Sequence, residues 1–190
     1  MHQIPIEVSA RHIHITQKDL EVLFGSGYRL TKLRDLSQPG AFAAQECVTL
    51  QNGDNKIENV RIVGPCRSYS QVELCLTDAL TLALKNVPIR KSGDLKGTPG
   101  LLLIGPKGRV FLEKGVIIPW RHLHISEKKA QALGLKHGQI VKIQVLGPRA
   151  LIFGNVLVRV SPHFKLTLHL DTDEGNACGL VKKGRGTLLI

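Results

Sequence analysis

The stretch ARHIHIT at residues 10–16 returns as WRHLHIS at residues 120–126, so one Arg-His-x-His phrase occurs twice in the chain. In each copy an apolar run precedes the phrase, and a hydroxyl residue with a short helical pattern follows it. Residues 6–25 and 117–134 therefore share one order of strand, His-x-His, helix cap and short helix. This repeat predicts two similar subdomains.

Most of the remaining chain consists of short β-type runs that Gly and Pro separate, a spacing typical of barrels and sandwiches. Helical patterns are few, and the two clear ones begin at the N-cap candidates Thr16 and Ser126 and end near Gly25 and Gly134. The composition and spacing thus predict a mainly β fold with short helices, built as two similar β-barrel domains. The expected strands cover residues 4–10, 47–64 with an Asn-Gly-Asp turn, 100–112, 138–147 and 150–162.

The expected domain boundary lies near residue 115. Residues 1–115 form the first domain, with the RHIH motif and a segment that carries Arg67 and Glu73, and residues 116–190 form the second, with RHLH and His169. Packing of the N-terminal strand on the second barrel is left open.

The charge of the chain indicates an anionic partner. Lys and Arg number 26 against 15 Asp and Glu, which gives +11 at pH 7. Nucleic acid, an acidic surface and a phosphorylated small molecule all satisfy this charge. Aromatic residues make up only 4% and no docking motif for nucleic acid is present, so the composition disfavours nucleic acid.

Location and redox state follow from further sequence features. No apolar run is long enough to span a bilayer, so no membrane is expected as a partner. The first residues show no leader pattern and no amphipathic extension, which predicts a cytoplasmic protein. The four cysteines contain no C-x-x-C pair and are expected to be reduced thiols.

The paired histidines indicate a metal site. Alternate residues of a strand point to the same face, so His12 and His14 share one face, as do His122 and His124. Two imidazoles on one face can bind one metal ion such as zinc. A single His-x-His is more often structural, but half of the eight histidines occur in the two matched phrases, which favours metal binding.

Two H-x-H pairs do not fill two ligand shells, so further ligands are expected elsewhere. Glu73, in QVELCL, is one candidate, with a solvated outward face as its alternative. His169, in LTLHLDTDEG, is another, with a structural role as its alternative. The remaining histidines are expected to be surface residues: His2, His137 and His163.

Cys66 and Arg67 are neighbours in GPCRSYSQVEL, residues 64–74. A neighbouring cation lowers the pKa of a thiol, so Cys66 is a candidate nucleophile. No histidine base lies next to it in sequence, and a packing role is favoured.

Six segments together resemble the PduL-type phosphate propanoyltransferases, the phosphotransacylase family associated with propanediol-degrading microcompartments. The resemblance extends in order over nearly the whole chain. The segments are VSARHIHIT, LSQPGAFAAQE, ENVRIVGPCRSYSQVEL, SGDLKGTPGLLLIGPKGRV, RHLHIS and LHLDTDEGNACG.

The resemblance implies two β-barrel domains that enclose a two-metal site, usually with zinc. It implies reversible exchange of CoA and inorganic phosphate on an acyl group, with acyl-CoA, phosphate and acyl phosphate as partners. Arg67 is implied as the phosphate-binding residue. The implied metal ligands are His12, His14, Glu73, His122, His124 and His169.

Several points stay open at this stage. Propionyl-CoA and acetyl-CoA are both candidate substrates, and the CoA-contacting residues, the metal in the cell and a homo-oligomeric state are not assigned. A metal-dependent thioester hydrolase and a non-catalytic metal- or nucleic-acid-binding barrel are the alternative functions. Microcompartment members often carry an N-terminal encapsulation peptide, and its absence here favours the cytoplasm over the microcompartment lumen.

Overall fold

The computed structural model describes residues 2–189, and these form a mainly β structure with 44% strand and 14% helix. The chain divides into two compact units. Unit 1 contains the described residues up to Ala10 and those from Trp120 onward, and unit 2 contains Arg11–Pro119. None of the helices within residues 2–189 has the length and apolar character needed to cross a membrane.

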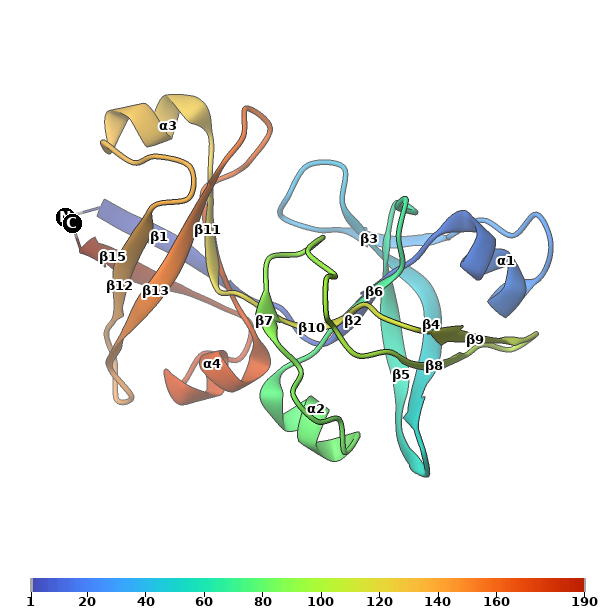
Figure 1. Cartoon of the computed structure of the whole chain (residues 1–190). Helices are drawn as coiled ribbons and strands as arrows, with labels where there is room; N and C mark the ends of the chain where they lie inside the picture. The colour runs from blue at the N-terminus through green and yellow to red at the C-terminus, as the bar shows by residue number, and fades with distance from the viewer. Residues whose placement is uncertain (1, 190) are drawn as a thin grey trace. The chain divides into compact units, whose positions relative to one another are not determined.

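Unit 1 is a closed barrel, in which β15 pairs back with β1 (Figure 1). Its short helices are α3 (Glu127–Ala132) and α4 (Thr172–Ala177). The interior is a cluster of aliphatic side chains that includes Ile6, Leu123 and Leu168. Around the barrel the strands are β1 (His2–Val8), β14 (Thr167–Leu170), β11 (His122–Ile125), β13 (Leu151–Val160), β12 (Ile140–Val145) and β15 (Lys183–Leu189).

Unit 2 is built on a curled sheet that, within the described residues, stays open between β7 and β9. Its helices are α1 (Gln17–Phe24) and α2 (Leu76–Thr81), and its own apolar core includes Ile13, Ile62 and Val72. In sheet order the strands are β7 (Ile89–Arg90), β10 (Val116–Pro119), β6 (Gln71–Glu73), β2 (His12–His14), β5 (Asn55–Gly64), β4 (Phe42–Asn52), β8 (Leu101–Ile104) and β9 (Arg109–Leu112), with β3 (Lys32–Asp35) beside β4.

The two helices expected from the sequence are present with their expected caps. The Thr16 side chain accepts a hydrogen bond from the Asp19 amide at 3.0 Å, and Gly25 ends α1. Ser126 caps α3 in the same way. The mainly β prediction is therefore confirmed, together with both predicted helices.

Helices α2 and α4 were not expected from the sequence. In the segment after His169, Asp171 caps α4 by accepting a hydrogen bond from the Glu174 amide at 2.8 Å. Gly175 allows this helix to pack closely on β1, because a Cβ there would lie 2.7 Å from a Val8 methyl group. The position of α4 thus depends on a contact that is remote in sequence.

Each His-x-His strand has a parallel neighbour on one side and an antiparallel neighbour on the other. In unit 2, β2 lies between β5 and β6, and His12 is opposite Glu73. In unit 1, β11 lies between β13 and β14, and His122 is opposite His169. Glu73 and His169 therefore occupy equivalent positions in their units.

The strands on the far sides of β6 and β14 are also equivalent in the two units. Strand β10 runs parallel to β6, with Ile117 opposite Glu73. Strand β1 runs parallel to β14, with Glu7 opposite His169. The expected division into domains at residues 1–115 and 116–190 stays a prediction.

Candidate metal centres

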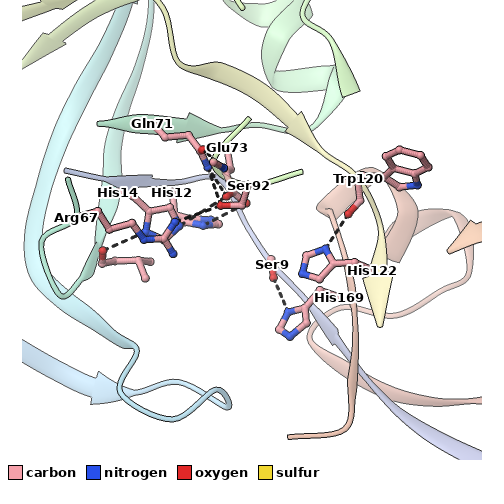
Figure 2. Close-up of polar contacts among 12 residues, drawn as sticks. Ser9, His12, His14, Arg67, Gln71, Glu73, Ser92, Trp120, His122 and His169 are labelled. Carbon is pink, nitrogen blue, oxygen red and sulfur yellow. Dashed lines mark hydrogen bonds and ion pairs between the residues drawn. The ribbon is translucent and has the colours of Figure 1, made fainter. Parts of the chain in front are cut away.

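Unit 2 brings His12, His14 and Glu73 together, and we call these residues the unit 2 trio. One ligand atom from each of the three lies within 4.8 Å of the others. The Nε2 atoms of His12 and His14 lie 3.5 and 3.7 Å from the Glu73 carboxylate oxygens (Figure 2). Glu73 is only 7% exposed, so its alternative assignment to a solvated face is wrong.

The environment of the unit 2 trio holds it in a metal-binding form. Burial, with a smaller contribution from His12, lowers the pKa of His14 from 6.5 to about 3, so this imidazole is neutral at pH 7. Gln71 Nε2 donates a hydrogen bond to Glu73 Oε1 at 2.6 Å and orients the carboxylate. Neutral imidazole and a fixed carboxylate are suitable ligands for zinc.

Unit 1 brings together His122, His124 and His169, and we call these residues the unit 1 trio. Their ring centroids lie 4.6 to 5.2 Å apart. His124 also stacks on Phe164, with centroids 4.0 Å apart. Of the described residues, only the unit 2 trio has its ligand atoms all within 4.8 Å of one another.

A backbone contact determines the tautomer of His122 in the unit 1 trio. His122 Nδ1 lies 2.7 Å from the Trp120 carbonyl oxygen (Figure 2). Because a carbonyl oxygen only accepts, Nδ1 carries the proton and Nε2 keeps its lone pair. This is the arrangement that metal-binding histidines usually have.

His124 is the buried imidazole of the unit 1 trio. Both of its ring nitrogens are buried, and neither has a hydrogen-bond partner in the described structure. Burial, together with His122 and His169, lowers the pKa of His124 from 6.5 to about 2. A buried polar group without a partner is costly, and a bound cation would satisfy it.

The two depressed pKa values predict an acid-sensitive metal-free protein. His14 and His124 are neutral when folded but protonate near pH 6.5 when unfolded, so their contribution to stability is complete above that pH and falls as the pH drops toward 3. We expect the free energy of unfolding of chelator-treated protein to fall by roughly 1 kcal/mol per pH unit for each histidine between pH 6 and 5.

Denaturant titrations of the metal-free protein at pH 7, 6 and 5 measure this slope. His124→Gln should reduce it, whereas replacement of the exposed His163 by alanine should leave it unchanged. A slope that is the same in His124→Gln and in the parent protein would contradict the assignment of a neutral, buried His124.

Arg67 is anchored near the start of helix α1. Its backbone amide donates to the Ile15 carbonyl at 2.8 Å, and its Nη1 donates to Ser92 Oγ at 3.2 Å (Figure 2). Burial raises the pKa of the neighbouring Cys66 thiol, and this thiol donates to Gln17 Oε1 at 3.6 Å. These contacts support the packing role of Cys66 over an activated thiolate.

The arginine of each Arg-His-x-His phrase forms an ion pair that sequence analysis did not anticipate. Arg11 Nη2 lies 2.6 Å from Asp78 Oδ1, and Arg121 Nε lies 2.5 Å from Glu174 Oε1. Each acidic partner is the third residue of a short helix, α2 or α4, and also accepts from the backbone of the helix N-cap. Each arginine thus links the start of a His-x-His strand to the helix that follows the antiparallel neighbour of that strand.

The remaining histidines are exposed, as expected: His2, His137 and His163. Gln71 and Ser92, which contact Glu73 and Arg67, were missed by the sequence analysis. Only their position in the segments that carry the family resemblance could have indicated them.

Comparisons with known proteins identify the relatives of this chain. The family model for phosphate propanoyltransferase matches residues 5–181. A phosphate propanoyltransferase from Thermotoga maritima is 51% identical over 93% of this chain and 84% of its own length. Relatives of the same name from Leptotrichia buccalis and Clostridioides difficile are 47% and 46% identical, over 96% and 94% of this chain and 86% and 85% of their own lengths. The chain therefore belongs to the phosphate propanoyltransferase family.

Proposed function

We propose that this protein is a phosphotransacylase that converts a short-chain acyl-CoA and inorganic phosphate into acyl phosphate and CoA. A phosphate oxygen forms a bond to the thioester carbonyl carbon, the carbon–sulfur bond breaks, and the sulfur leaves as thiolate and takes up a proton. Family membership across residues 5–181 carries this proposal. The reverse reaction uses the same groups.

We propose that each trio holds one divalent metal ion, with zinc as the first choice. The donor sets fit zinc, because they consist of imidazoles and one carboxylate. Both trios contain an imidazole that is neutral well below pH 7, and His122 has its Nδ1 proton committed to a backbone carbonyl. A dinuclear site is part of this proposal, and two ions per chain is its testable consequence.

When bound, such ions act as Lewis acids that polarise the carbonyl oxygen and neutralise phosphate charge. Arg67 is proposed to bind the phosphate, because a guanidinium keeps its charge and its planar fork matches two phosphate oxygens. The Ile15 carbonyl and Ser92 hold Arg67 in place from its backbone and its side chain. Arg67 thus orients the nucleophile without having to move a proton.

We propose direct attack by phosphate within a ternary complex, and the state of Cys66 supports this proposal. Burial raises the pKa of this thiol, and its hydrogen-bond partner is the Gln17 side chain rather than a base. A protonated thiol is a poor nucleophile. Ping-pong kinetics, or an acyl group trapped on Cys66, would contradict direct attack.

Propionyl-CoA is the proposed preferred substrate because the relatives bear the name phosphate propanoyltransferase. Acetyl-CoA is the second candidate, since one methylene changes binding by only about 1 to 3 kcal/mol. The net charge of +11 supports attraction of CoA, which carries a diphosphate and a further phosphate.

We also infer that the two units are related barrels, although the sheet of unit 2 stays open. The pairing of each His-x-His strand is the same in both units, and so are the positions of Glu73 and His169. A barrel opened at one edge is consistent with this common arrangement.

The assay that tests the function follows CoA thiol release from propionyl-CoA by metal-loaded protein, with and without inorganic phosphate. Hydroxylamine trapping of propionyl phosphate identifies the second product. We expect thiol release only with phosphate and one acyl phosphate per thiol. Equal release in both conditions would show a thioester hydrolase instead.

A further inference from the structure

The loop after β7 carries a hydroxyl group that meets both Arg67 and Gln71. Ser92 Oγ lies 3.2 Å from Arg67 Nη1 and 3.0 Å from Gln71 Nε2 (Figure 2). The same Gln71 Nε2 lies 2.6 Å from Glu73 Oε1. Ser92 is half-buried, whereas Gln71 is fully buried.

The orientation of the Gln71 amide follows from a backbone contact. The Gly93 amide donates to Gln71 Oε1 at 2.7 Å, and a backbone N–H cannot accept. Gln71 Nε2 must therefore face Glu73 and Ser92, and its two hydrogens are both used. Because every polar atom of this buried amide is engaged, the position of the Ser92 loop is well defined.

The two contacts to Ser92 determine which way its hydroxyl points. Arg67 Nη1 and Gln71 Nε2 can only donate, so Ser92 Oγ accepts from both of them. A hydroxyl has two acceptor lone pairs and one hydrogen. With both lone pairs engaged, only the hydrogen is left to form a further hydrogen bond. Within residues 2–189 the hydrogen bonds of this hydroxyl are the two that it accepts, and a charged donor on its oxygen makes its hydrogen a stronger donor.

We infer that the Ser92 hydroxyl is a second contact for the phosphate substrate and donates to an oxygen of the anion that Arg67 binds. This inference rests on the proposed function and adds a residue to it. An oxygen that accepts from the guanidinium lies within reach of a hydroxyl 3.2 Å from Nη1. Ser92 thereby adds a directional contact without adding charge.

The test compares Ser92→Ala with Ser68→Ala in steady-state kinetics. Ser68 is the matched control, because it is an exposed serine next to Arg67 and its side chain forms no hydrogen bond with the residues that the structure describes. We expect Ser92→Ala to raise the KM for phosphate and for propionyl phosphate about tenfold, as for loss of a hydrogen bond to a charged group. The KM for propionyl-CoA and the metal content should not change, and Ser92→Thr should restore most of the affinity.

A double variant separates direct contact from positioning of Arg67. If Ser92 contacts phosphate itself, Ser92→Ala weakens the binding of phosphate further in an Arg67→Ala background. If it acts only by holding Arg67, it has no effect in that background, and the inference is overturned. An unchanged KM for phosphate in Ser92→Ala would overturn it as well.

A measurement of inorganic phosphate binding tests the role of Ser92 without depending on the reaction. Calorimetric titration of the metal-loaded protein with phosphate should show weaker binding in Ser92→Ala than in Ser68→Ala. If the wild-type protein shows no phosphate-dependent thiol release, the proposed function fails, but this titration still decides the role of Ser92. Equal affinity in the two variants would exclude the contact.

Discussion

His122→Ala is expected to remove bound metal and to lower phosphate-dependent CoA release by roughly 100-fold or more, because ligand losses exceed the effects of outer-shell changes. The Trp120 carbonyl oxygen holds the His122 ring so that Nε2 offers its lone pair. Without this imidazole, His124 and His169 are the only members of the unit 1 trio that remain. Metal analysis of the purified variant and the thiol assay measure the two effects together.

His163→Ala is the matched control for this prediction, because His163 is exposed in the same unit. It should retain wild-type metal and activity. A His122→Ala protein with full metal content would remove His122 from the proposed ligands.

Arg67→Ala is expected to lower kcat/KM for phosphate by about 100-fold, a loss typical of a group that stabilises transition-state charge. The guanidinium is the proposed cation at the phosphate, so both the KM for phosphate and the turnover should suffer. Metal content should stay at the wild-type level, because Arg67 contacts Ser92 and the backbone rather than acting as a ligand. Steady-state kinetics at varied phosphate, with metal analysis, measures this result.

The exposed Arg29 provides the control for lost positive charge in the same unit. Arg29→Ala should behave as wild type, and Arg67→Lys should recover only part of the loss because a point charge cannot form the two-point contact. Loss of metal in Arg67→Ala would show that Arg67 has a structural role.

The His-x-His pairs were predictable because one rule of local geometry, the alternation of side chains along a strand, is enough to place them. Alternation in a strand puts His12 and His14 on one face, and the same holds for His122 and His124. The structure agrees, with ring centroids 4.9 and 4.6 Å apart in the two pairs. Spacing alone did not identify the third member of each trio, because Glu73 and His169 depend on strand register.

Short elements were the least predictable part of the fold. Helices α2 and α4 have six residues each, and such helices gain little from intrinsic propensity. They depend on caps and on the ion pairs with Arg11 and Arg121, whose partners lie 67 and 53 residues away in sequence. Gln71 was missed for the same reason, since its three partners come from two separate segments.

The measurement that tests the central proposal most directly is phosphate-dependent CoA release by protein that has been stripped of metal and then reloaded with zinc. The account predicts no activity in the stripped protein, recovery as zinc approaches two ions per chain, and no release without phosphate. Full activity in protein that retains no metal, or thiol release that does not depend on phosphate, would contradict this proposal.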